Sequence, residues 1–138
     1  MTRDRDAVAK LFRQEYDLAV GHVSAPPIVN LCNLMLTDAF KSGARGIRAV
    51  PVDAEHGGID YDIDGQWQPV MQLPIKVFST LINRFKVMAV LDTGRVPVQE
   101  GELHVRLDGV LRVLTIRTEA TSAAHELLTI ALPADGAA

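Results

Sequence analysis

The segment Ile59-Asp60-Tyr61-Asp62-Ile63-Asp64-Gly65 decides the fold class of this chain. Its apolar side chains alternate with aspartates, which is typical of a β-strand with one buried face and one solvated face. The Asp-Gly pair that ends it favours a two-residue hairpin turn, so the chain is expected to return as a second strand over residues 66–72. The segment therefore predicts an antiparallel sheet.

Helical periodicity lies on both sides of this hairpin. Upstream, the pair Pro26-Pro27 suits a helix start, and residues 27–42 are apolar over most of a helical circumference. One polar stripe interrupts this helix at spacings of three and four, and it consists of Asn30, Asn33, Thr37 and Lys41. Downstream, Pro74 begins a helix whose apolar stripe runs to Ala89. The apolar excess of the first helix has two open explanations, which are burial between the sheet and another helix, or contact with a partner protein.

Strand periodicity returns outside these helices. A strand is expected over residues 47–52, and a later meander contains a second hairpin dipeptide, Asp108-Gly109. The expected strands of that meander cover residues 96–99, 103–107, 110–116 and 127–132. Runs of hairpin-linked strands interrupted by single helices indicate an α+β fold with a mostly antiparallel sheet.

The N-terminal residues add one more expected helix. Apolar residues between Val8 and Leu18 have helical spacing, so residues 3–20 are predicted to form it. About three helices would then pack against the sheet. The predicted organisation is an accessory helix within residues 1–24, an α+β domain over residues 25–132 and a tail over residues 133–138.

Composition limits the function classes that this chain can serve. Its 138 residues are 48% hydrophobic and 22% charged, which suits one globular domain with a real core. The net charge of −3 and the scattered Lys and Arg residues argue against a nucleic-acid partner. Cys32 is alone, which favours a reducing compartment. Neither a signal peptide nor a membrane-spanning stretch is recognisable, so we expect a cytoplasmic location without membrane insertion.

Several stretches follow one another in an order that is found in a known family. Residues 25–44 open with Ala-Pro-Pro-Ile-Val-Asn-Leu and close with Lys-Ser-Gly-Ala, residues 47–51 form a strand ending in proline, and residues 61–65 form a Tyr-x-Ile-Asp-Gly hairpin. The most specific stretch is Asn83 to Asp92, which is similar to Arg-Ile-Lys-Ile-Met-Ala-x-Leu-Asp. Together they resemble the second N-terminal domain of type II secretion and type IV pilus assembly ATPases. The resemblance implies a PAS-like fold, with helices against one sheet.

The chain also departs from the pattern of that family. Residues 45–51 read Arg-Gly-Ile-Arg-Ala-Val-Pro in place of Ser-Asp-Ile-His-Ile-Glu-Pro, and Glu102 stands where an arginine is typical. Residues 124–126, Ala-His-Glu, replace Gly-Glu-Lys. The sequence contains no Gly-x-x-x-x-Gly-Lys-Ser/Thr motif to cradle a triphosphate. The resemblance thus implies a free-standing, chemically degenerate domain that lacks the ATPase core and is not an enzyme.

Other groupings of polar residues have simpler explanations than a site. Residues 60–65 imitate the start of a calcium-binding loop, but the twelfth position is Met71 instead of a bidentate Glu. The four histidines lack metal-ligand spacing, and Cys32 in an apolar helix is expected to be buried and inert. We therefore predict no cofactor, metal or catalytic residue.

The expected function is a protein-interaction or regulatory role without catalysis. As a hypothesis, the domain docks onto a secretion or pilus assembly ATPase, or forms a homo-oligomer. The candidate partner-binding residues are Asn30, Asn33, Thr37, Lys41, Arg84 and Lys86. Arg84 and Lys86 are expected to point to different sides of their helix, either solvated or facing an acidic partner. The alternative is a PAS-like sensor domain that binds a small molecule or a nucleotide.

Overall fold

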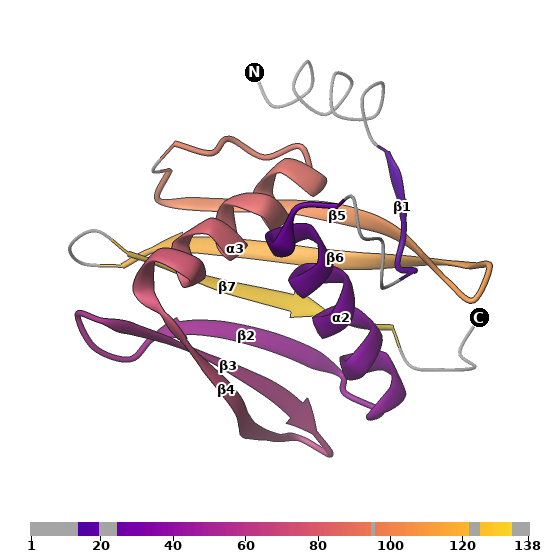
Figure 1. The fold of residues 1–138 in the computed structure, drawn as a ribbon, viewed down its shortest axis with the longest axis horizontal. Coiled ribbons are helices and arrows are strands. Elements are labelled where there is room, and N and C mark those ends of the chain that lie inside the picture. The colour runs from indigo at the N-terminus through magenta and orange to yellow at the C-terminus, as the bar shows by residue number, and fades with distance from the viewer. Residues whose placement is uncertain (1–13, 20–24, 95, 122–124, 134–138) are drawn as a thin grey trace.

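The computed structural model describes residues 14–19, 25–94, 96–121 and 125–133. Within these residues, one seven-stranded sheet carries two helices on the same face (Figure 1). The strands are β1 (Glu15–Asp17), β2 (Gly46–Pro51), β3 (His56–Ile63), β4 (Gln66–Pro74), β5 (Val98–Leu107), β6 (Val110–Ala120) and β7 (Glu126–Ala131). The helices are α2 (Pro27–Lys41) and α3 (Ile75–Met88).

The order of the strands brings distant parts of the chain together. Across the sheet the order is β1-β5-β6-β7-β2-β3-β4, so β7 joins the two halves by lying between β6 and β2. All neighbouring pairs are antiparallel except β1 with β5. The predicted α+β class with a mostly antiparallel sheet is therefore confirmed, while the PAS-like resemblance stays a prediction.

A single layer of apolar side chains fills the space between the helices and the sheet. The largest fully buried members are Leu18, Met35, Leu36, Ile47, Ile59, Phe78, Leu81, Phe85, Met88, Leu103 and Leu114. On the strands, every second residue points into this layer, as the period of two requires. Neither helix in the described part of the chain is long and apolar enough to cross a membrane.

Helix α3 packs its Phe78 ring against a glycine of β3. A Cβ atom built on Gly57 would lie 2.0 Å from Cδ1 of Phe78, so only glycine leaves room for that ring. Phe78 is 1% exposed. Contact between α3 and the sheet therefore depends on the absence of a side chain at position 57.

Both hairpins form where the Asp-Gly pairs predict them. Asp64 and Gly65 have φ angles of 53° and 84°, and Asp108 and Gly109 have φ angles of 51° and 78°. Positive φ at both central residues is the conformation of a type I′ turn, which matches the twist of antiparallel strands. These turns set the register of β3 with β4 and of β5 with β6.

The strands predicted over residues 96–99 and 103–107 are in fact one continuous strand, β5. The expected gap at residues 100–102, which contains Gly101, is wrong. A Cβ atom at this position would lie 3.0 Å from Cδ2 of Leu91 and 3.3 Å from the carbonyl oxygen of Ala89. Glycine is used here to let the chain after α3 cross closely over the strand.

The helix predicted over residues 3–20 is wrong in its described part, since residues 15–17 form strand β1. Residues 3–13 and residue 20 of that prediction lie outside the described residues. Tyr16 and Leu18 alternate with Asp17, which is the period of a strand. Residues 15–17 pair with the edge of β5. Leu18 is 2% exposed in the core. The described residues thus contain two helices where about three were expected.

The face of the sheet opposite the helices carries polar and apolar side chains that remain partly exposed. Leu111 and Val113 of β6 are each 41% exposed there. Arg48 of β2 donates to Oδ2 of Asp60 at 2.8 Å, and its guanidinium lies 4.5 Å from the ring centroid of Trp67. At the outer edge, β4 contains Pro69 and an irregularity of its pairing with β3, so this edge is a poor template for another strand.

Candidate functional site

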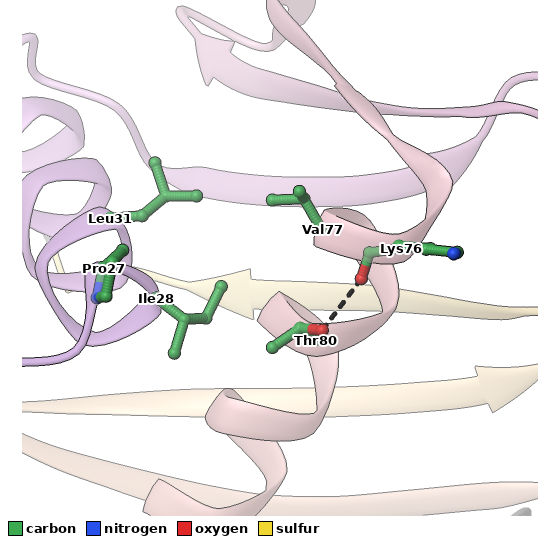
Figure 2. Close-up of a pocket in the computed structure, with 6 residues that line it drawn as sticks. All are labelled: Pro27, Ile28, Leu31, Lys76, Val77 and Thr80. Carbon is green, nitrogen blue, oxygen red and sulfur yellow. Dashed lines mark hydrogen bonds between the residues drawn. The ribbon is translucent and has the colours of Figure 1, made fainter.

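An apolar hollow lies between the first turns of α2 and α3, and we call it the α2–α3 hollow (Figure 2). Its volume is about 290 Å³, and its lining consists of Pro27, Ile28, Leu31, Lys76, Val77 and Thr80. Ile28 and Leu31 point toward α3, whereas the ammonium end of Lys76 points away from α2 (Figure 2). The Thr80 hydroxyl donates to the carbonyl oxygen of Lys76 at 2.8 Å, so it is already satisfied. The hollow therefore offers mainly hydrophobic contact.

Prolines position both helix starts that line the hollow. Pro26 and Pro74 precede the helices in extended conformations, with φ and ψ of −57° and 146° and of −53° and 145°. Neither helix has a side-chain cap. Proline fixes its own φ and carries no N–H, so it delivers the chain to a first turn without leaving a further donor unpaired.

The apolar residues of α2 are divided between a face buried in the core and positions that line the hollow or remain exposed, so the first expected explanation, burial, holds for part of the helix, and contact with a partner stays a prediction. The buried face of α2, with Cys32, Met35, Leu36 and Ala39, packs on the sheet. Ile28 and Leu31 instead line the hollow, and Leu34 beside them is 53% exposed. We did not name these residues as site candidates from the sequence. The available signal was apolar coverage wider than the stripe that a surface helix needs.

The polar stripe of α2 faces the β1 side of the molecule. Asn33 is buried at 7% exposure, and Asn30 and Thr37 are half-buried. The Thr37 hydroxyl donates to the carbonyl oxygen of Leu18 at 3.5 Å. Lys41 is exposed and lines a separate hollow of about 490 Å³, together with Asp17 and Asp108. A partner-binding role for this stripe stays a prediction, because its middle lies against the chain's own β1 segment.

Arg84 and Lys86 point to different sides of α3, as expected. The Arg84 guanidinium lies 5.2 Å from the centroid of the Tyr16 ring on β1. Lys86 is fully buried, so the expectation that it would be solvated is wrong. Its Nζ donates to Oε1 of Glu126 at 2.6 Å and to the carbonyl oxygen of Gly94 at 3.4 Å. The acidic partner of Lys86 is thus β7 of the same chain.

Two buried groups with acidic protons have pKa values above their ordinary range. Burial raises the pKa of the Cys32 thiol to about 12, which fits the predicted inert cysteine. Burial and a hydrogen bond to Asp38 both raise the pKa of Tyr61. The Tyr61 hydroxyl donates to Oδ2 of Asp38 at 2.9 Å, which ties α2 to β3. Both groups are neutral at physiological pH and have structural roles.

The aspartates of β3 lie on a strand, as the alternation predicts, with flanking strands instead of flanking helices. The carboxylate of Asp60 forms an ion pair with Arg48. In the part of the chain that the structure describes, no three His, Cys, Asp or Glu side chains are grouped so as to hold a metal ion.

Comparison with known proteins identifies the family of this chain. The sequence profile of the family described as Type II/IV secretion system protein matches residues 22–128. The chain is similar to the type II secretion system ATPase E of Vibrio cholerae, with 33% identity over 86% of the chain and 23% of that protein. It is also similar to the type II secretion system protein E of Dickeya dadantii, with 37% identity over 73% of the chain and 20% of that protein.

A relative from pilus assembly shows the same partial coverage. The type IV pilus assembly ATPase PilB of Myxococcus xanthus is 35% identical over 60% of the chain and 15% of its own length. This chain therefore spans less than a quarter of each of these three relatives. The matched part corresponds to the N-terminal region of the ATPases and not to their catalytic core. We conclude that this chain belongs to the family of Type II/IV secretion system proteins.

Proposed function

We propose that this chain is a non-catalytic interaction domain of a type II secretion or type IV pilus assembly motor, and that it docks through the α2–α3 hollow. The observation that carries this proposal is the apolar lining of the hollow, in which Val77 is 36% exposed, together with Leu34, which is 53% exposed on α2 three residues after Leu31. Contiguous exposed apolar surface with a polar rim is typical of protein-contact sites. An apolar side chain of a partner would fill the hollow and bury this surface.

The chemistry of the hollow supports a protein occupant over a nucleotide. Nucleotides need donors and acceptors that converge on phosphate and base, but the hydroxyl of Thr80 is engaged and the ammonium of Lys76 points outward. The layer between helices and sheet is filled by side chains such as Phe78 and Phe85.

The charged side chains of the described residues support a role without catalysis. Lys86 is paired with Glu126, Arg48 with Asp60, and Arg117 with Glu100. The chain contains no motif that would cradle a triphosphate. We expect the purified 138-residue chain to release no phosphate from ATP above the level of a buffer blank.

The docking proposal is tested by recovering partners of the tagged chain from its native cells and identifying them by mass spectrometry. We expect a secretion or pilus assembly ATPase to be recovered with the wild-type chain. Leu34→Asp and Val77→Asp should each reduce its recovery about tenfold or more, as expected when roughly 1.4 kcal/mol of contact energy is lost.

Val110→Asp is the matched control, because Val110 is 51% exposed on the β5–β6 hairpin, away from the hollow. It should leave recovery of the ATPase unchanged. Thermal unfolding of all three variants verifies that they remain folded. Equal recovery of the ATPase by wild type, Leu34→Asp and Val77→Asp would exclude docking through the hollow.

A further inference from the structure

Strand β1 is a short attachment to an edge that is much longer. It pairs in parallel with β5 through three positions, Glu15 with His104, Tyr16 with Val105 and Asp17 with Arg106. Strand β5 has 10 residues, so β1 covers only part of its edge. Helix α2, the next described element, lies on the helical face of the sheet (Figure 1).

The contacts of β1 define a receptor for an extended Glu-Tyr-x-Leu segment. Leu18 is 2% exposed in the core, and its N–H donates to the carbonyl oxygen of Arg106 at 2.9 Å. The Tyr16 ring lies beneath the Arg84 guanidinium at 5.2 Å. Glu15 accepts from Arg106 at 2.8 Å. Backbone pairing, an apolar site, a cation–π contact and an ion pair thus recognise four consecutive residues.

We propose that this receptor also accepts Glu15–Leu18 of a second copy, so that two chains exchange their β1 strands reciprocally. Every contact of the receptor joins residues 15–18 to the body of the domain, and an exchanged pair re-forms each of them between chains. Exchange of an identical element is for this reason a low-cost route to a dimer. The proposal goes beyond docking on a motor and does not depend on the α2–α3 hollow.

The start of α2 and the vacated edge both support exchange. Pro26 is extended, and the pair Pro26-Pro27 has no N–H groups, so neither of these two residues can donate a backbone hydrogen bond to its own domain. When β1 leaves, the edge of β5 presents unpaired backbone groups and the site of Leu18 opens. Residues 15–18 fit the edge of β5 and the site of Leu18, and a second copy of the chain carries the same four residues.

The opposite edge of the sheet is a weaker place for two copies to join. Pro69 and Pro74 in β4 cannot donate to a new ladder, and the pairing of β3 with β4 shifts register at Ile59 and Asp60. Continuous pairing of a second sheet along β4 is therefore disfavoured. A dimer that forms through strand pairing is therefore expected to form at the edge of β5 that β1 covers.

The test uses two full-length variants, Glu15→Cys and His104→Cys, whose positions are register partners. Cys32 is retained, because its side chain is buried in the folded protein. The variants are mixed, one with a tag that changes its mass, incubated at high concentration, diluted and treated with a short bis-maleimide. We expect a product joining one chain of each kind, in an amount that rises with the concentration during incubation.

A mixture of Glu15→Cys with Gln66→Cys is the matched control, because Gln66 is exposed on β4, at the opposite edge of the sheet from β1 and outside the α2–α3 hollow, and measures random collision. We expect the Glu15–His104 product to exceed this control at least about fivefold. The double variant Glu15→Cys/His104→Cys should crosslink within one chain at low concentration. Exchange is overturned if the mixed product only equals the control, or if the double variant does not crosslink. Neither result would alter the recovery of an ATPase through Leu34 and Val77.

Discussion

Lys86 has its ammonium group out of solvent, between a carboxylate of Glu126 and the carbonyl oxygen of Gly94. Removing an ion from water costs several kcal/mol, and a buried pair recovers this cost only when its geometry and hydrogen bonds are good. Glu126 is 15% exposed and lies 40 residues away in sequence. The pair therefore fastens α3 to the start of β7, and it accounts for the lysine in an otherwise apolar part of the helix.

Replacement of Lys86 by methionine should lower the free energy of unfolding by about 3–5 kcal/mol, because it leaves the Glu126 carboxylate without its partner. The double variant Lys86→Met/Glu126→Leu should recover much of that loss, since it removes both charges together. Urea unfolding of the wild type, both single variants and the double variant measures the coupling. Arg117→Met, in an exposed pair with Glu100, is the control and should change stability little. A stable Lys86→Met single variant would show that the pair does not hold α3 in place.

At the scale of elements, the contact of α3 with β3 is set by Gly57 and Phe78. The ring of Phe78 occupies the space that a Cβ atom at position 57 would need. Gly58, the next residue, faces the other side of the sheet, where a Cβ atom would lie 3.0 Å from Cγ2 of Val52. Val52 is 52% exposed and can move aside. The two neighbouring glycines thus have different tolerances because they point to different faces.

Gly57→Ala should destabilise the fold by about 2–3 kcal/mol or more, because overpacking forces the helix or the ring to shift. Gly58→Ala should cost less than about 1 kcal/mol, since only an exposed side chain has to move. Thermal or urea unfolding of both variants tests this difference. Equal stabilities of the two variants would contradict the close approach of α3 to the sheet at position 57.

Elements with strong local signals could be predicted from the sequence, and those set by distant pairing could not. The Asp-Gly hairpins at 64–65 and 108–109 and the helices after Pro26 and Pro74 all depend on neighbours in sequence. The N-terminal segment was predicted as a helix because Leu18 fits a helical stripe, yet the edge of β5, about 90 residues later, draws it into a strand. In the candidate site, apolar excess on α2 was visible, but which face would stay open depends on where α3 packs.

At the scale of the whole molecule, the free energy of unfolding should fall as the pH rises into the alkaline range. Burial raises the pKa of Cys32 from 9.0 to about 12, and burial also raises the pKa of Tyr61. Above pH 9 the unfolded chain loses the thiol proton while the folded chain keeps it, so the unfolded state is favoured. The contribution of Cys32 is complete below pH 9 and falls by about 1.4 kcal/mol for each pH unit above it.

Urea unfolding at about pH 8 and about pH 10 measures this loss. The wild type should lose on the order of 1 kcal/mol between these values from Cys32 alone. Cys32→Ala should show a shallower loss, with the rest contributed by groups such as Tyr61. Identical pH slopes for the wild type and Cys32→Ala would show that the thiol does not retain its proton in the folded state.

The placement of the lysines has a practical consequence for footprinting with amine-reactive reagents. Lys76 lies at the rim of the α2–α3 hollow, Lys41 is exposed at the far end of α2, and Lys86 is sealed inside the folded domain. Acylation of Lys86 would therefore report unfolding, and protection of Lys76 while Lys41 stays accessible would report an occupied hollow. The chain thus carries an internal set of reporters that separates loss of a partner from loss of the fold in a single peptide map.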